Sequence, residues 1–536
     1  MTPYFAFGRR SFLLGASALA LFAPAAARAA SSSTVAPKGA PVSGGTLIVG
    51  QYQEPTFFDP NRQYSYETYR LDKHIYESLV AEDLSTPAED GPPPLVPALA
   101  ESWEISPDAK TFTFHLRKGV NFHDGTDFDA EAVRFNVRRF TDDTFEYFDA
   151  RSQATMTRVY GDLTEVRVLD SHTVQYVFSR PFLEFLRLLP QGNFVSGIFS
   201  PKALQTWGQD DLAAHPTGTG PYRFVERVHG EKTVLERNPD YWGKAPLSDR
   251  IVFRPIQDDN TRLAALRSGE IDILTRTPVD AVEGLEAEGY QVLQSPGASL
   301  LFLEWNFRNE FAAKREIRQA IIQAINRAEL AKVILRGHAD PAYNILNVGN
   351  DAYDPAQKDY AYDPEASRRL IAEAGYKEGE IKFTLITDEA NQQVLEWVQR
   401  DLAAVGIKAE LVSQEWLVYT ANLGKLTPDI AAYAMEWGFV TPYWLKIVYD
   451  LYIVSRGGGE AFVGDKLAPA IQAAADATDR TEALKLWKAA NAEFAHQVGA
   501  IPLATFTRYY TTAPQVRGFN VPQQNFYDLS PVWIEK

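Results

Sequence analysis

The chain has 536 residues, of which 45% are hydrophobic and 23% charged, a composition typical of a folded protein with more than one domain. Its formal net charge of −16 disfavours non-specific binding to nucleic acid or to an anionic membrane surface. Because cysteine is absent, the chain has no thiolate metal site, disulfide, cysteine nucleophile or lipid-modified N-terminal cysteine.

The N-terminus has the pattern of an export signal. Arg9 and Arg10 precede an apolar run over residues 12–27, which is short and rich in alanine for a membrane span. The paired arginines resemble the twin-arginine signal, although Gly8 replaces the usual Ser or Thr. We therefore expect residues 1–30 to be a twin-arginine export signal, with the general secretory route and an uncleaved anchor as alternatives. Residues 31–43, rich in Ser, Pro and Gly, are expected to be a flexible leader.

The first half of the body shows mainly strand patterns. Residues 46–50 form a short apolar run between glycines, and residues 111–117 alternate apolar and polar side chains at a period of two. Two further runs, 165–169 and 173–178, flank a short polar turn and predict a hairpin. Between them, Asp129 has the place of an N-cap for a helix over residues 130–139.

Helices alternate with strands in the second half. Apolar residues at helical spacing over 317–325 predict one helix, and Asn326 with Glu329 predicts a capping box that begins the next. Asp363 followed by Pro364 marks another helix start. Residues 382–386 and 407–412 read as strands on either side of a helix. This alternation predicts an α/β fold.

Catalytic and metal-binding patterns are not found in the sequence. It contains no Gly-x-Ser-x-Gly elbow, no phosphate-binding loop and no His-Glu-x-x-His motif. Residues 217–222 are glycine-rich but read as a tight turn. His115, His123 and Asp124 come closest to a metal cluster, yet they flank a strand and its turn, which favours structural roles. We therefore expect a protein that is not an enzyme and that uses no cofactor and no metal.

Seven segments, in order along residues 44–536, carry a resemblance to a known family. They are 99–126, which begins Leu-Ala-Glu-Ser-Trp, 218–224 (Gly-Thr-Gly-Pro-Tyr-Arg-Phe), 236–242 (Glu-Arg-Asn-Pro-Asp-Tyr-Trp), 263–272, 318–321, 362–365 and 372–376. Together they resemble the family 5 extracellular solute-binding proteins of ABC importers, the oligopeptide- and dipeptide-binding group.

The resemblance implies an α/β fold of the two-lobed periplasmic-binding-protein (type II) clamshell kind, with an extra subdomain in lobe I. Lobe I is expected to comprise 44–80, 205–295 and 500–536, the subdomain 81–204, and lobe II 296–499. The chain is expected to cross between the lobes near 295–301 and 499–505. The resemblance also implies a periplasmic monomer. Such a protein passes a small-molecule or peptide ligand to an inner-membrane permease with separate ATPase subunits. Because cysteine is absent and no later stretch approaches 18 uncharged apolar residues, we expect the mature chain to be neither a lipoprotein nor membrane-inserted.

The charged anchors that the resemblance implies for small peptides are missing here. Dipeptide- and oligopeptide-binding members hold the ligand's amino group with an Asp that follows a Trp. In this chain Trp437 is kept, but residues 439–441 supply no carboxylate. Dipeptide binders also hold the carboxylate with an Arg where this chain reads Leu-Ile-Thr-Asp-Glu over 385–389. Because burying an unpaired charge costs several kcal/mol, losing both anchors argues against a small zwitterion.

Aromatic and acidic side chains remain as candidate ligand contacts. They are Trp416, Trp437, Glu436, Asp388, Glu389, Tyr443 and Trp444. Aromatic faces suit sugar rings, cations or apolar side chains, although Trp444 is equally compatible with core packing. Glu436 either replaces the missing Asp or points away. The favoured ligand is peptide-type (an oligopeptide, a modified peptide or an opine-like compound), with an oligosaccharide as the alternative. Other functional classes left open are a secreted hydrolase and a chaperone-like or sensor protein.

Overall fold

The computed structural model describes residues 33–34, 40–55, 57–62, 65–88, 92–190, 197–438, 441–458, 466–523 and 526–535. The expected export signal, 1–30, lies outside the described residues. Part of the expected leader is described. The Ser33 carbonyl accepts a hydrogen bond from the N–H of Val521 at 2.9 Å, and Thr34 forms an isolated antiparallel bridge to Asn520. At these two positions the leader is held against the body, whereas the sequence predicted flexibility.

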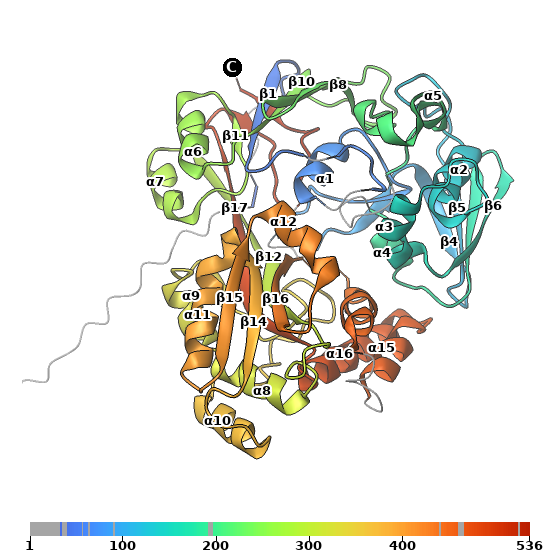
Figure 1. Cartoon of the computed structure of the whole chain (residues 1–536). Helices are drawn as coiled ribbons and strands as arrows, with labels where there is room; N and C mark the ends of the chain where they lie inside the picture. The colour runs from blue at the N-terminus through green and yellow to red at the C-terminus, as the bar shows by residue number, and fades with distance from the viewer. Residues whose placement is uncertain are drawn as a thin grey trace, which may run out of the picture. The chain divides into compact units, whose positions relative to one another are not determined.

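A mixed sheet of eleven strands organises the body (Figure 1). The strand order is β15-β14-β16-β12-β17-β11-β1-β10-β9-β8, and β13 also pairs with β17. Their bounds are Thr46–Gln51 (β1), Tyr222–Val228 (β8), Lys232–Arg237 (β9), Arg250–Pro255 (β10), Ile273–Leu274 (β11), Gln291–Trp305 (β12), Ala339–Pro341 (β13), Lys382–Asp388 (β14), Lys408–Gln414 (β15), Ile430–Trp437 (β16) and Ala500–Thr512 (β17). The strands predicted at 46–50, 382–386 and 407–412 are thus confirmed. In one half of the sheet β14 runs parallel to β15 and β16, and in the other β1 runs parallel to β10 and β11.

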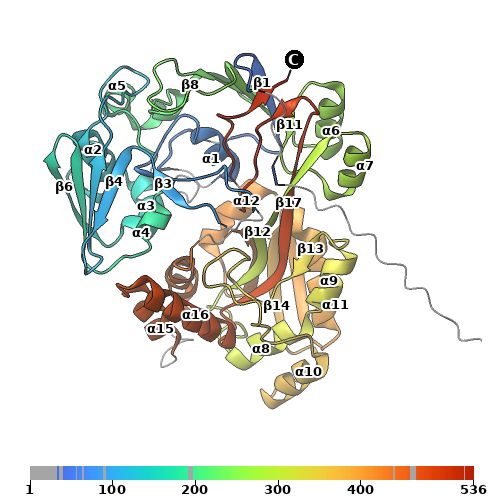
Figure 2. The same cartoon turned by 180° about the vertical axis from the view of Figure 1, so that it is seen from behind.

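Two long antiparallel strands, β12 and β17, join these halves (Figure 2). β12 pairs with β16 through its C-terminal part, and the end of β17 pairs with β11. Their mutual register shifts between Ser295 and Ser299, where β12 bulges and Gly297 has a φ of 65°. Glycine adopts this left-handed conformation without a Cβ penalty, and a bulge bends the strand that contains it. The bulge therefore lies where the chain passes from one half of the sheet to the other.

A separate four-stranded antiparallel sheet has the order β4-β5-β7-β6. Its strands are Ala100–Ile105 (β4), Thr111–Leu116 (β5), Leu163–Asp170 (β6) and Thr173–Phe178 (β7); the two-stranded pairs are Val80–Glu82 (β2) with Leu95–Pro97 (β3) and Val516–Arg517 (β18) with Trp533–Ile534 (β19). In β5 the residues alternate between half-buried and fully buried, and the Phe112 ring packs edge-on against Phe178 and Phe185. The predicted period-two strand and hairpin are both confirmed.

The helices flank these sheets, and their starts follow the predicted caps. Their bounds are Tyr66–Asp72 (α1), Ala130–Thr141 (α2), Ala150–Tyr160 (α3), Phe185–Leu188 (α4), Pro201–Asp211 (α5), Asp259–Ser268 (α6), Val282–Ala287 (α7), Arg315–Ala324 (α8), Arg327–Val333 (α9), Pro364–Glu373 (α10), Gln392–Ala403 (α11), Trp416–Asn422 (α12), Trp444–Val448 (α13), Leu467–Ala475 (α15) and Arg480–His496 (α16). Asp129, Asn326 and Asp363 each accept a hydrogen bond from the backbone three residues on. The capping box at Asn326 forms only in half, because the Asn326 N–H donates to Asp401 at 2.9 Å.

The glycine-rich segment 217–222 is held by close packing. A Cβ on Gly218 would lie 2.1 Å from the Ile75 carbonyl oxygen, and one on Gly220 would lie 2.6 Å from the His74 carbonyl oxygen. The Gly220 N–H also donates to the Ile75 carbonyl at 2.9 Å. These glycines therefore allow two backbone segments to touch, and the sequence prediction of a tight turn missed this role.

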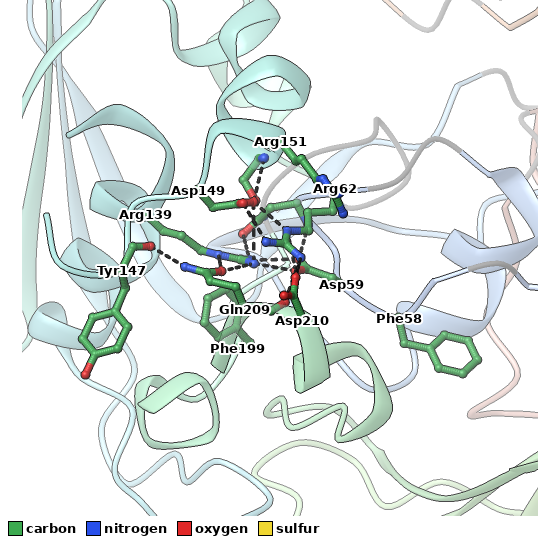
Figure 3. A network of polar contacts seen from close by, with 12 residues as sticks. Phe58, Asp59, Arg62, Arg139, Tyr147, Asp149, Arg151, Phe199, Gln209 and Asp210 are labelled. Atoms are coloured by element: carbon green, nitrogen blue, oxygen red, sulfur yellow. Dashed lines mark hydrogen bonds and ion pairs between the residues drawn. The ribbon is translucent and has the colours of Figure 1, made fainter. Parts of the chain in front are cut away.

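Buried charges fix residues 59–62 to α2 (Figure 3). Arg139, on α2, and Asp59 have completely buried side chains, and their ion pair measures 2.5 Å. The Arg139 Nε also donates to the side chain of Gln209 at 3.0 Å, which ties in α5. Arg62 pairs with Asp149 at 2.6 Å. Each of the two arginines lies within hydrogen-bond distance of a carboxylate. Removing one partner of a buried pair leaves the other charge without compensation, so the network stabilises this fold only while both partners of each pair are present.

Candidate functional site

Three parallel strands bring the predicted site residues to one edge of the sheet. Asp388, at the end of β14, pairs in register with Gln414 at the end of β15, and β16 runs parallel beside β14. Glu436 and Trp437 end β16, and Trp416 begins α12 two residues after β15. Ligands of open α/β sheets bind outside the carboxyl ends of the strands. This carboxyl edge is therefore the candidate site, and α12 lies over it (Figure 1).

Glu436 points toward the crossing strands. Its carboxylate forms an ion pair with Arg508 of β17, and Ser299 of β12 donates a hydrogen bond to it at 2.9 Å. The side chain of Glu436 is only 22% exposed and that of Arg508 only 17% exposed. Burial, followed by the nearby positive charge of Arg276, lowers the pKa of Arg508 to about 9, so the guanidinium stays charged at neutral pH. Glu436 thus already has a cationic partner within the protein.

Trp437 is half-buried at the end of β16. Its ring centroid lies 6.3 Å from that of Phe302 and 5.8 Å from that of Trp444. The next residue, Gly438, donates its N–H to the Tyr66 hydroxyl of α1 at 3.3 Å. Burial raises the pKa of Tyr66 to about 12, which keeps that hydroxyl neutral. This segment therefore contacts the half of the body that contains β1.

Trp416 is accessible, with 45% of its surface exposed. Its ring lies 6.1 Å from that of Tyr419, whose hydroxyl donates to the Ala434 carbonyl of β16. The helix that carries Trp416 is in this way fixed to the strand that carries Glu436 and Trp437. An exposed indole on a fixed helix offers a flat apolar face for stacking.

Of the remaining predicted site residues, three are buried and one, Glu389, is exposed. Tyr443 and Trp444 are 7% and 3% exposed and belong to the hydrophobic core, where Tyr443 packs on Phe182 at 4.7 Å. Asp388 is buried and accepts a hydrogen bond from the side chain of Asn391 at 2.7 Å, whereas Glu389 is exposed. The core environment of Tyr443 and Trp444 matches the packing role that the sequence left open for Trp444.

The opposite half of the sheet supplies residues that the sequence did not single out. Gly50 of β1 pairs with Leu274 of β11, so Tyr52 and Arg276, each two residues further on, reach the same edge. The Arg276 guanidinium lies 4.5 Å from the Tyr52 ring centroid. Arg276 has a φ of 51°, uncommon for a residue with a side chain, and the following N–H, of Thr277, donates to Tyr509 of β17 at 2.8 Å. The signal available in the sequence was a basic residue two positions after a short apolar run, since Arg276 follows Ile273 and Leu274 of β11.

His123 and Asp124, which belong to the group closest to a metal cluster in the sequence, form structural hydrogen bonds. His123 lies 3.0 Å from the Gly220 carbonyl through Nε2, and Asp124 accepts a hydrogen bond from Ser200 at 2.6 Å. Across the ranges that the structure describes, no three His, Asp or Glu side chains are grouped so as to hold a metal ion. None of the helices in those ranges has the length and apolar character needed to cross a membrane.

The model for the middle region of the bacterial extracellular solute-binding proteins, family 5, matches residues 94–455. The chain belongs to this family. Glutathione-binding protein GsiB of Escherichia coli O1:K1 / APEC is 32% identical over 322 residues, which are 59% of this chain and 60% of that protein.

Solved family structures match nearly all of the body. The periplasmic binding protein DppA from Helicobacter pylori, in complex with the peptide STSA, is 28% identical with a TM-score of 0.81, covering 92% of this chain and 99% of that one. The binding protein AgaA from A. tumefaciens R10, in complex with agropinic acid, is 25% identical with a TM-score of 0.79 over the same shares. The family resemblance and the two-lobed α/β clamshell are confirmed.

Proposed function

We propose that this protein is the periplasmic solute-binding component of an ABC importer and that its solute is peptide-type: an oligopeptide, a modified peptide or an opine-like compound. The observation that carries the proposal is the meeting of two carboxyl edges. Glu436 and Gly438, on either side of Trp437, contact Arg508 and Tyr66, respectively, beside the crossing strands. Polar and aromatic groups converging between lobes are typical of a solute site.

The proposal includes the lobe boundaries and their movement. Lobe I would comprise 44–80, 205–295 and 500–536 with the subdomain 81–204, and lobe II 296–499. The register shift between Ser295 and Ser299, opposite Phe506 and Arg508, supports a hinge there. Two short segments that absorb the φ/ψ change are sufficient to move intact lobes. Export of a monomer through the twin-arginine route, and delivery to a permease with separate ATPase subunits, complete the proposal.

An oligosaccharide is the second candidate, because Trp416 presents an exposed indole face at the site. Thermal unfolding of the ligand-free protein, measured against peptides, opines and oligosaccharides, distinguishes the classes. A solute at one hundred times its Kd stabilises the folded state by about 2.7 kcal/mol, so the melting temperature should rise with a peptide or opine. A rise with oligosaccharides alone would favour the second candidate. Product formation without stabilisation would favour a secreted hydrolase.

Removing either site tryptophan should weaken solute binding. We expect Trp416→Ala and Trp437→Ala each to raise Kd at least tenfold, about 1.4 kcal/mol, because a large apolar surface and a stacking face are lost. Titration calorimetry with the solute found by thermal unfolding measures the change, and circular dichroism checks that the variants fold.

The matched control is Trp207→Ala on α5, whose indole is 46% exposed and stacks on His215 away from the carboxyl edge. Its Kd should equal that of the wild type. If both site variants also bind with wild-type affinity, the two indoles do not contact the solute.

A further inference from the structure

The carboxylate of Glu436 pairs with Arg508, a partly exposed arginine, where the two halves of the sheet meet. Glu436 pairs with Arg508, and Ser299 holds the carboxylate through its 2.9 Å hydrogen bond. Arg508 also lies 4.9 Å from the Phe506 ring centroid, so its planar group has an apolar face on one side. A guanidinium in this setting binds carboxylates well, because its donors match the two oxygens.

A second cation stands next to this pair. The positive charge of Arg276 acts on both Arg508 and Glu67. In the part of the chain that the structure describes, Arg276 contacts the Tyr52 ring but pairs with no carboxylate. Arg70 pairs with Glu67 on α1. The cluster therefore holds three guanidinium groups against two carboxyl groups, so positive charge is in excess there.

We infer, on the basis of the proposed function, that Arg508 and Arg276 form a carboxylate-binding subsite and that the solute is an anionic, carboxylate-bearing compound. Glu436 occupies Arg508 while the solute is absent. A solute carboxylate then displaces Glu436 from Arg508 and lies between the two guanidinium groups. Its negative charge compensates the positive charge of Arg276.

After this exchange every buried charge keeps a partner of opposite sign if the solute also carries an amine. Removing one partner from a buried ion pair is costly, because the other charge is left without compensation. An ammonium group on the solute would pair with the displaced Glu436 while the solute carboxylate pairs with Arg508. Amino-acid derivatives with a net negative charge meet both conditions, and an uncharged sugar meets neither.

Small carboxylates test the subsite without knowledge of the solute. In E436Q the internal carboxylate is gone, so acetate should bind Arg508 and Arg276 and stabilise the fold. We expect sodium acetate to raise the melting temperature of E436Q by at least about 2 °C more than sodium chloride of equal ionic strength. The wild type should show no such difference. If E436Q does not fold, S299A, which only loosens Glu436, should show a smaller acetate effect of the same sign.

Second substitutions identify the binding groups. Adding R508M or R276M to E436Q should abolish the acetate effect, whereas adding R267M, a surface arginine paired with Glu288, should leave it intact. Equal melting temperatures of E436Q in acetate and chloride would overturn the inference. It would also be overturned if the solute found by thermal unfolding lacked a carboxylate and bound R508M with wild-type affinity. That result would leave the proposed function standing, whereas failure of every solute to bind would remove the proposed function itself.

Discussion

Replacing Arg139 with methionine is expected to lower the free energy of unfolding by about 3 kcal/mol, because Asp59 would lose its 2.5 Å partner in a completely buried site and keep only Arg62, at 3.7 Å. The variant also leaves the Gln209 side chain without its guanidinium partner. Equilibrium unfolding in urea, followed by circular dichroism, measures the change.

The control is Arg134→Met on the same helix. Arg134 is 40% exposed and pairs with Glu131, so its loss should change stability by no more than about 0.5 kcal/mol. A cost at position 139 as small as that at position 134 would show that the network in Figure 3 does not stabilise the fold.

Replacing Glu304 with glutamine is expected to stabilise the protein above pH 7. Glu304, at the end of β12, is buried, and burial raises its pKa from 4.5 to about 7 despite the charge of Arg456 and a hydrogen bond from Tyr433. The native state therefore holds this proton more tightly than the unfolded chain does. The contribution to stability is complete below pH 4.5 and is lost as the pH rises through 7.

The size of this effect follows from the shift. A difference of two to three pKa units corresponds to about 3 kcal/mol, which the wild type loses on going from acidic to alkaline pH and the glutamine variant does not. Urea unfolding at a series of pH values should show the two stability curves separating above pH 5. Parallel curves would mean that Glu304 is ionised in the folded protein at no cost. Glu310→Gln, at an exposed position, controls for the substitution itself.

Local patterns in the sequence were sufficient for much of the fold. Asp129, Asn326 and Asp363 cap helices as expected, because a cap depends on the residue and the three that follow it. The strand predicted from the alternation over 111–117 is also correct, because this pattern too depends only on neighbouring residues. Asp401, which replaces Glu329 at the capping box, comes from another helix and no local pattern identifies it.

The candidate site could be predicted only in part. The sequence indicated Asp388, Trp416 and Trp437 as candidate ligand contacts, and the parallel strands β14, β15 and β16 place them at one edge. The partner of Glu436 could not be predicted, since Arg508 lies on a strand remote in sequence. Aromatic residues presented the same difficulty. Tyr443 is in the core and Trp416 is exposed, yet both are aromatic residues in the same region of the sequence.

The interlobe capture of a solute is tested most directly by small-angle X-ray scattering of the protein with and without the solute found by thermal unfolding. Rotation of intact lobes about the register shift in β12 predicts that the radius of gyration falls on saturation. The far-ultraviolet circular dichroism spectrum should stay unchanged. A radius of gyration that is identical at zero and at saturating solute would contradict capture by closure.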